Sequence, residues 1–88
     1  MASWPAPTER PLLFTTSWCP YCARLKSGLA RAGVAYDETD VEADDAAAEF
    51  VKSVNGGNRV VPTVLFPDGS TVTNPPAAVV AERLASAG

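Results

Sequence analysis

Short apolar runs alternate with apolar positions at helical spacing in the first half of the chain. Residues 12–16 form a short, mostly apolar run after a proline, which predicts a buried strand. Pro20 suits the first turn of a helix, and Gly33 suits its end. The apolar face of that helix would contain Cys22, Leu25, Leu29 and Ala32. The pattern therefore predicts a strand followed by a helix, with a second strand at residues 34–41.

The middle of the chain repeats this order. Asp44 or Asp45 can cap a second helix, whose apolar face would contain Ala47, Phe50, Val51 and Val54. A turn rich in glycine and asparagine follows at residues 55–58. Residues 60–66 then predict a third strand with a proline near its start.

The last quarter predicts a hairpin and a final helix. Residues 67–70 read Pro-Asp-Gly-Ser, which favours a tight turn into a short fourth strand at 71–73. Asn74 can cap the third helix, with Pro75 in its first turn. Its buried face would contain Ala77, Val80, Ala81 and Leu84.

The predicted order, β-α-β-α-β-β-α, indicates an α/β fold. A parallel β-α-β unit followed by an antiparallel hairpin gives a four-stranded mixed sheet, and helices on both faces would bury the apolar stripes. The 88 residues suffice for one small domain, which we place at residues 12–88. Residues 1–11 contain three prolines and predict a flexible N-terminal tail.

Composition narrows the possible partners and the compartment. The net charge is −3 and no basic block occurs, so nothing indicates nucleic-acid binding. No apolar run approaches the ~20 residues of a membrane helix, and the N-terminus does not read as a signal peptide. We therefore expect a cytoplasmic protein in a reducing compartment. Histidine is absent, which removes Cys-His dyads and histidine metal ligands.

Both cysteines lie in one motif, Cys19-Pro20-Tyr21-Cys22, at the predicted strand-to-helix turn. Zinc would need four ligands, so two cysteines without histidine do not predict a metal site within one chain. A structural disulfide closing about four residues would gain only ~2 kcal/mol by the chain-entropy relation. The spacing and position favour a redox-active pair.

Position within the helix predicts a division of labour between the two thiols. Unpaired N–H groups and the helix dipole at the first turn favour the thiolate of Cys19, with Lys26 and Arg59 as candidate helper charges. Cys22, one turn later, should be more buried. We expect Cys19 to attack and Cys22 to resolve. Trp18 and Tyr21 flank the nucleophile and are candidates for walls of the site.

The C-P-Y-C motif, together with Val60-Val61-Pro62 opening the third strand, resembles the glutaredoxins of the thioredoxin fold. The resemblance spans residues 12–87 and extends in detail to the mycoredoxins of actinobacteria, on stretches such as 15–19, 35–38, 46–51, 53–59, 68–71 and 73–75. It implies a cis peptide at Val61–Pro62 facing the cysteines. It also implies an enzyme without a bound cofactor, a monomer, and catalytic roles for Cys19 and Cys22. The substrate-binding residues it implies are Trp18, Pro20, Tyr21, Arg59, Val60, Val61, Pro62, Thr73 and Asn74.

Two departures from ordinary glutaredoxins bear on the small thiol. Thr16 stands where those proteins commonly carry a lysine, and Thr73-Asn74-Pro75-Pro76 replaces their Gly-Gly turn. In ordinary glutaredoxins, the lysine and the N–H groups of the Gly-Gly turn bind the carboxylates of glutathione. The two prolines of this chain remove N–H donors from that turn. We expect mycothiol, a sugar-based thiol without those carboxylates, to be the electron donor. The expected substrates are protein–mycothiol mixed disulfides.

Two alternatives stay open on sequence grounds. One is a dithiol glutaredoxin-like electron donor to ribonucleotide reductase, recharged by thioredoxin reductase. The other is a non-catalytic module, either an iron–sulfur scaffold shared by two chains or a binding adaptor.

Overall fold

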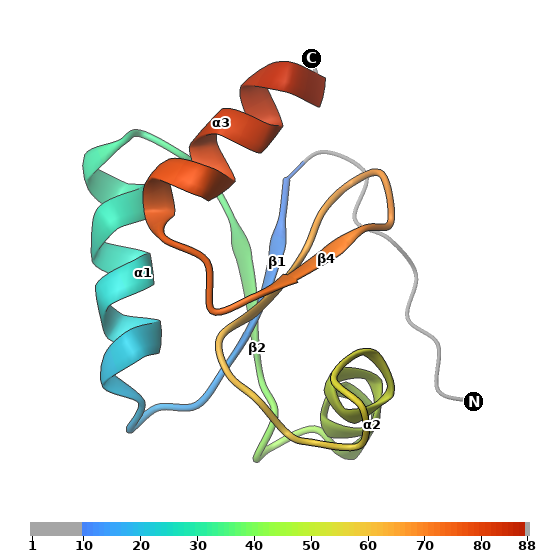
Figure 1. Ribbon diagram of the computed structural model, residues 1–88. Coiled ribbons are helices and arrows are strands. Elements are labelled where there is room, and N and C mark those ends of the chain that lie inside the picture. Colours follow the sequence, from blue (N-terminus) through green and yellow to red (C-terminus); the bar gives the residue numbers. More distant parts are fainter. Residues whose placement is uncertain (1–9, 88) are drawn as a thin grey trace.

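The structure is a computed structural model that describes residues 10–87, with side chains described for residues 10–85. Nearly all of the expected N-terminal tail lies outside the described residues. The observed order of elements confirms the predicted β-α-β-α-β-β-α arrangement (Figure 1). The elements are β1 (Leu12–Thr15), α1 (Pro20–Arg31), β2 (Asp37–Asp40), α2 (Asp45–Val54), β3 (Thr63–Leu65), β4 (Thr71–Thr73) and α3 (Ala77–Ala87).

The four strands form one mixed sheet in the order β2-β1-β3-β4. β1 pairs in parallel with β2 and antiparallel with β3, and β3 pairs antiparallel with β4. Phe14 near the end of β1 is opposite Thr63 at the start of β3, and Thr63 is opposite Thr73 at the end of β4. This register brings the segments that follow β1, precede β3 and follow β4 to a single edge of the sheet.

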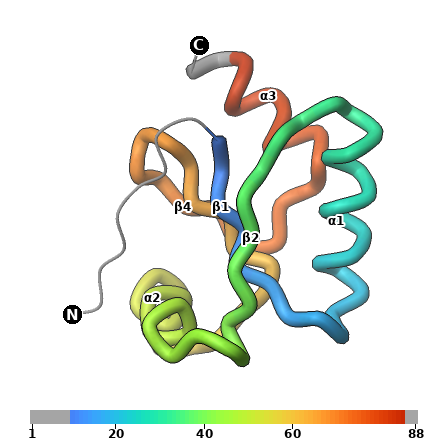
Figure 2. Tube along the Cα trace, turned by 180° about the vertical axis from the view of Figure 1, so that it is seen from behind, coloured from blue at the N-terminus to red at the C-terminus, as the bar shows by residue number. Residues whose placement is uncertain are grey.

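The central strands are buried on both faces because helices cover both. Phe14 and Leu65 pack with α2, whereas their neighbours Leu13 and Val64 pack with α1 and α3. This follows from the alternation of side chains along a strand. Figures 1 and 2 show α1 and α3 together on one side of the sheet and α2 on the other. None of the described helices is long and apolar enough to cross a membrane.

Gly28 allows α1 and α3 to approach closely. A Cβ atom at this position would lie 2.6 Å from the Cβ atom of Ala77, closer than side chains tolerate. A glycine inside a helix costs about 1 kcal/mol relative to alanine. The close approach of the two helices therefore explains why a helix-weakening residue stands here.

Element boundaries differ from the sequence-based prediction in several places. The second strand begins only at Asp37, because Val34 and Tyr36 instead pack from a loop onto the core beside α1. The third strand is limited to residues 63–65, and the carbonyl of Val60 before it accepts a hydrogen bond from the side chain of Thr63. Two expected core positions are exposed, Ala32 at the C-cap of α1 and Val54 at the end of α2.

Asn74 does not cap the third helix, so that prediction was wrong. Its φ is 49°, a left-handed conformation that asparagine adopts more readily than most residues. Its backbone N–H donates to the carbonyl of Pro62 at 2.7 Å. Helix α3 starts three residues later, where the carbonyl of Pro76 accepts from Val79 and Val80. Asn74 therefore ties the end of β4 to the Pro62 segment.

Candidate active site

Cys19 occupies the N-cap of α1, with the extended backbone typical of that position. Its Sγ accepts a hydrogen bond from the backbone N–H of Cys22 at 3.3 Å. Pro20 follows at the first helical position, where its lack of an N–H costs nothing. The sulfur therefore takes the place that a serine or aspartate oxygen takes in other helices. The positive end of the helix dipole favours negative charge there.

Cys22 lies one turn further on and has no solvent-exposed surface. The pKa of its thiol is raised from 9.0 to about 11, chiefly by burial and also by the neighbouring Cys19. A backbone hydrogen bond with Thr16 offsets part of this effect. Cys22 consequently stays protonated at neutral pH. The expected order of burial, with Cys22 deeper than Cys19, is confirmed.

The predicted cis peptide at Val61–Pro62 is present. The carbonyl oxygen of Val61 lies 3.9 Å from the Sγ of Cys19, within reach of a weak thiol hydrogen bond. Within residues 10–87, nothing accepts a hydrogen bond from the N–H of Val61. Val61 thus offers an unpaired backbone donor close to the sulfur, where an extended substrate can pair.

Asn55, at the C-cap of α2, makes side-chain hydrogen bonds to the strands that flank the Val61–Pro62 segment. Its side-chain N–H donates to the carbonyl of Val51 at 2.9 Å and to Thr63 Oγ1 at 3.2 Å. Its side-chain oxygen accepts from the hydroxyl of Thr73, and the hydroxyl of Thr63 donates to Val60 at 2.8 Å. One amide therefore links α2, β3 and β4 beneath the cis proline. The sequence predicts only a turn at Asn55. It does not predict these hydrogen bonds, because Thr63 and Thr73 are distant from Asn55 in the chain.

The remaining predicted residues are distributed around the cysteine turn. Trp18 is 67% exposed and donates from Nε1 to Glu42 at 2.9 Å, so it leans towards the start of α2. Tyr21 is 55% exposed. Arg59 is exposed in the loop before Val60 and makes no described contact with either cysteine.

Lys26 is engaged elsewhere. Its Nζ lies 3.0 Å from Glu38, and this hydrogen bond raises the pKa of the lysine. The sequence-based idea that Lys26 activates Cys19 is therefore not supported by its position. The backbone N–H of Cys22 is the donor that the structure places on the sulfur.

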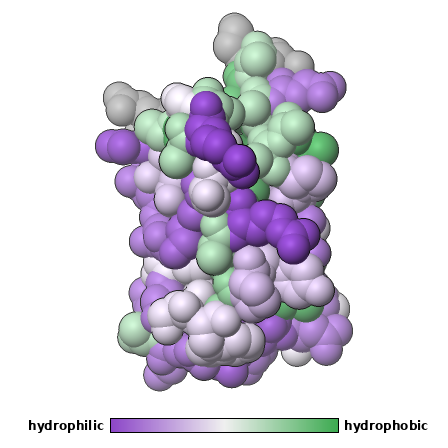
Figure 3. All heavy atoms as spheres, turned by 90° about the vertical axis from the view of Figure 1, so that its left-hand side faces the viewer, coloured by the Kyte–Doolittle hydropathy of each residue, from purple (hydrophilic) through white to green (hydrophobic). Residues whose placement is uncertain are grey.

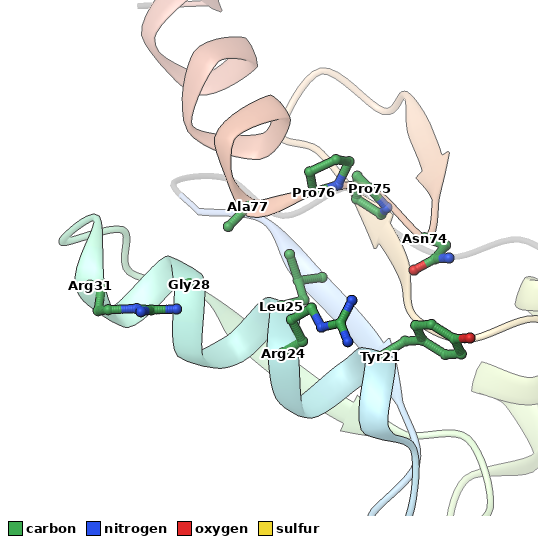
Figure 4. A pocket seen from close by; sticks show the side chains of 9 residues that line it. All are labelled: Tyr21, Arg24, Leu25, Gly28, Arg31, Asn74, Pro75, Pro76 and Ala77. Carbon is green, nitrogen blue, oxygen red and sulfur yellow. The ribbon is translucent and has the colours of Figure 1, made fainter.

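A groove of about 380 Å³ begins beside Tyr21 and runs between α1 and the segment leading into α3 (Figure 4). Asn74 lines its end near the cysteine turn, opposite Tyr21. Arg24 and Arg31 lie along its α1 wall. Sequence analysis did not predict a binding role for these two arginines, because their positions belong to the polar face of an amphipathic helix and are typical of residues that face solvent.

No cluster of three or more histidine, cysteine or acidic side chains that could hold a metal ion occurs among the described residues. The chemistry that the site offers is that of the sulfur atoms. One sulfur lies at the N-cap and accepts a backbone N–H, and a second, fully buried thiol lies one turn further along the helix.

Comparison with known proteins identifies the family. The glutaredoxin family model matches residues 12–72, which include both cysteines and the cis proline. The chain therefore belongs to the glutaredoxin family.

Close relatives occur in actinobacteria. A Mycobacterium tuberculosis protein assigned to the glutaredoxins is 62% identical over 72 residues, covering 82% of this chain and 86% of the relative. Mycoredoxin 1 of Corynebacterium glutamicum is 51% identical over 72 residues, covering 82% of this chain and 89% of the relative. Among solved structures, the thioredoxin-like protein BC3987 superposes with a TM-score of 0.67 at 29% identity, covering 85% of this chain and 99% of that one. Fold and family together define a thiol–disulfide oxidoreductase.

Proposed function

We propose that this oxidoreductase reduces protein–mycothiol mixed disulfides in the cytoplasm, with mycothiol as the electron donor. The Cys19 thiolate attacks the mycothiol sulfur, and the client protein leaves as a thiolate that takes a proton from solvent. Cys19 then carries mycothiol in a mixed disulfide. A second mycothiol thiolate attacks that disulfide, releases Cys19 and forms oxidised mycothiol. The oxidised mycothiol joins the mycothiol taken from the client to the incoming one, so each turnover consumes one free mycothiol.

The burial of Cys22 favours this one-cysteine route. A resolving thiol must ionise to attack, and burial, the largest cause of the raised pKa of Cys22, leaves little of its thiolate at neutral pH. An external thiol therefore competes well for the mixed disulfide on Cys19. The alternative route, in which Cys22 resolves and thioredoxin reductase recharges the disulfide, requires the buried sulfur to emerge.

The choice of mycothiol rests mainly on the turn between β4 and α3. The N–H of Asn74 is already bonded to Pro62, and Pro75 and Pro76 have none, so residues 74–76 offer no spare backbone donor to a carboxylate. Thr16, which is buried, supplies no positive charge on the other side of the cysteines. A small thiol without carboxylates loses nothing in such a site. The 51% identity to a protein named mycoredoxin supports the same choice.

Turnover of one protein–mycothiol mixed disulfide should be measured with three reductants: mycothiol, glutathione, and thioredoxin reductase with NADPH. We expect mycothiol to support the highest rate. Equal or faster turnover with glutathione would contradict the proposal. Efficient turnover with thioredoxin reductase alone would favour the dithiol route.

A proline-to-alanine exchange tests the reasoning about the turn. Pro75→Ala combined with Pro76→Ala restores two N–H donors without adding charge. We expect the ratio of glutathione-supported to mycothiol-supported turnover to rise about tenfold or more, since a hydrogen bond to a charged group contributes about 1.5–3 kcal/mol. Pro67→Ala, in the distant hairpin turn, is the matched control. An unchanged ratio in the double variant would contradict the assigned role of the turn.

A further inference from the structure

The groove beside Tyr21 combines an apolar floor with two arginines. Leu25 and Pro75 are buried beneath it, and Gly28 and Ala77 narrow it where the two helices meet. Figure 4 shows Arg24 near its middle and Arg31 at the end away from Tyr21. Figure 3 looks onto the α1 side of the molecule and shows strongly hydrophilic side chains beside hydrophobic ones. The groove therefore offers both apolar contact and positive charge.

The two arginines have no acidic counterpart. Arg10, Lys26 and Lys52 each form an ion pair with a carboxylate. No carboxylate among residues 10–85 lies within 4.0 Å of the guanidinium groups of Arg24 or Arg31. The same holds for Arg59 and Arg83, but of these four arginines only Arg24 and Arg31 line the groove. The described contact of Arg24 is with the ring of Tyr21, 6.0 Å from its centroid. Unpaired positive charge in a groove of a protein of net charge −3 indicates an anionic occupant.

We propose that this groove docks an acidic polypeptide segment of the client protein, on one side of the client's reactive cysteine. The inference rests on the proposed function, which provides a client bound at Cys19. A small thiol without carboxylates would leave both arginines without a counter-charge. A client polypeptide can supply two carboxylates at the required spacing.

The positions of the two arginines along α1 indicate where the acidic residues of the client would lie. Arg24 is five residues and Arg31 twelve residues beyond Cys19 along α1. At 1.5 Å per helical residue these positions lie roughly 7 and 18 Å along the helix axis. An extended chain covers about 3.3 Å per residue. Acidic side chains about two and five residues from the client cysteine would therefore meet the arginines.

The test uses two cysteine peptides as mixed disulfides with 2-mercaptoethanol. One peptide carries glutamate two and five residues after its cysteine, and the other carries glutamine there. The second-order rate of reaction with the reduced Cys22→Ser protein is measured by stopped-flow, so that no external reductant takes part. We expect the acidic peptide to react about three to ten times faster at low salt, and the ratio to fall towards one as salt screens the charges.

Matched charge reversals decide whether the groove is responsible. Arg24→Glu and Arg31→Glu should each reduce the acidic-to-neutral rate ratio at least twofold. Lys52→Glu, on α2 at the other face, makes the same change in net charge and should leave the ratio as it was. A ratio near one in the parent protein, or an equal fall in all three variants, would overturn the docking site. Because mycothiol is absent, this result is independent of the proposed electron donor.

Discussion

Helix α1 treats two identical thiols differently in its N-cap and in its first turn. At the N-cap, Cys19 receives a backbone N–H and lies beside the Val61 carbonyl at the sheet edge. One turn inside, Cys22 is fully enclosed, and burial raises its pKa to about 11. Position in the helix therefore gives the two sulfurs different surroundings. In the proposed function, Cys19 at the N-cap is the nucleophile, and the buried Cys22 is a thiol that stays protonated at neutral pH.

Removal of each sulfur in turn should give the largest difference in turnover between the two positions. Cys19→Ser should lower turnover of a protein–mycothiol mixed disulfide by about a thousandfold or more, because the remaining thiol, Cys22, has no exposed surface and a raised pKa. Cys22→Ser should stay within about threefold of the parent, since mycothiol resolves the intermediate. Steady-state turnover with purified variants provides the measurement. Equal losses in both variants would show that Cys22 is required.

The pH dependence of alkylation sharpens the comparison. In Cys19→Ser, Cys22 is the thiol left for iodoacetamide to modify. Burial, the largest cause of its raised pKa, persists in this variant, whereas the contribution of Cys19 is lost. We expect modification at pH 7 to be about tenfold or more slower than that of an unfolded control, because less thiolate is present. The rate should climb about tenfold per pH unit to beyond pH 9. A plateau near pH 9 would contradict the assigned burial effect.

The same shift predicts a loss of stability in alkali. The folded protein holds the Cys22 proton more tightly than the unfolded chain does, so its contribution to stability is complete below pH 9. That contribution is lost as the pH rises towards 11. Cys22→Ser should flatten this part of the stability profile in urea unfolding measured between pH 7 and pH 10.5. An identical alkaline slope in the parent and the variant would contradict the linkage.

Substitution of Asn55 has the smallest expected effect and tests whether the sheet edge positions Cys19. Asn55→Ala removes the amide that joins α2, Thr63 and Thr73, which should reduce the free energy of unfolding by about 1–3 kcal/mol. It should also slow single-turnover attack by Cys19 several-fold. Asn58→Ala, which removes one exposed hydrogen bond, is the control. Equal behaviour of the two variants in chemical denaturation and in attack rate would argue against this role.

The sequence predicted the parts of this comparison that depend on local structure. The cysteine motif at a strand-to-helix turn, the helix end at Gly33 and the mixed sheet all follow from periodicity and capping. The cis geometry of Val61–Pro62 came from family resemblance alone, since a cis bond has no local signal strong enough to derive it. Local patterns were thus sufficient for the fold.

Features that depend on tertiary contact escaped prediction. Asn55 reaches partners 8 and 18 residues away, so its role appears only when β3 and β4 are paired. Asn74 looked like a helix cap, but its N–H is taken by Pro62 across the sheet edge. Arg24 and Arg31 became visible as a groove wall only once α3 was placed against α1. Convergence of distant segments carries no sequence signal.

Intact-mass spectrometry of a single turnover tests the central claim most directly. Reduced Cys22→Ser protein is mixed with one equivalent of a protein–mycothiol mixed disulfide. The reaction is quenched with acid, and the intact masses of both proteins are measured. The account predicts that Cys19 gains the mass of mycothiol while the client appears as a free thiol. Transfer of the client protein itself onto Cys19, or no adduct at all, would contradict it.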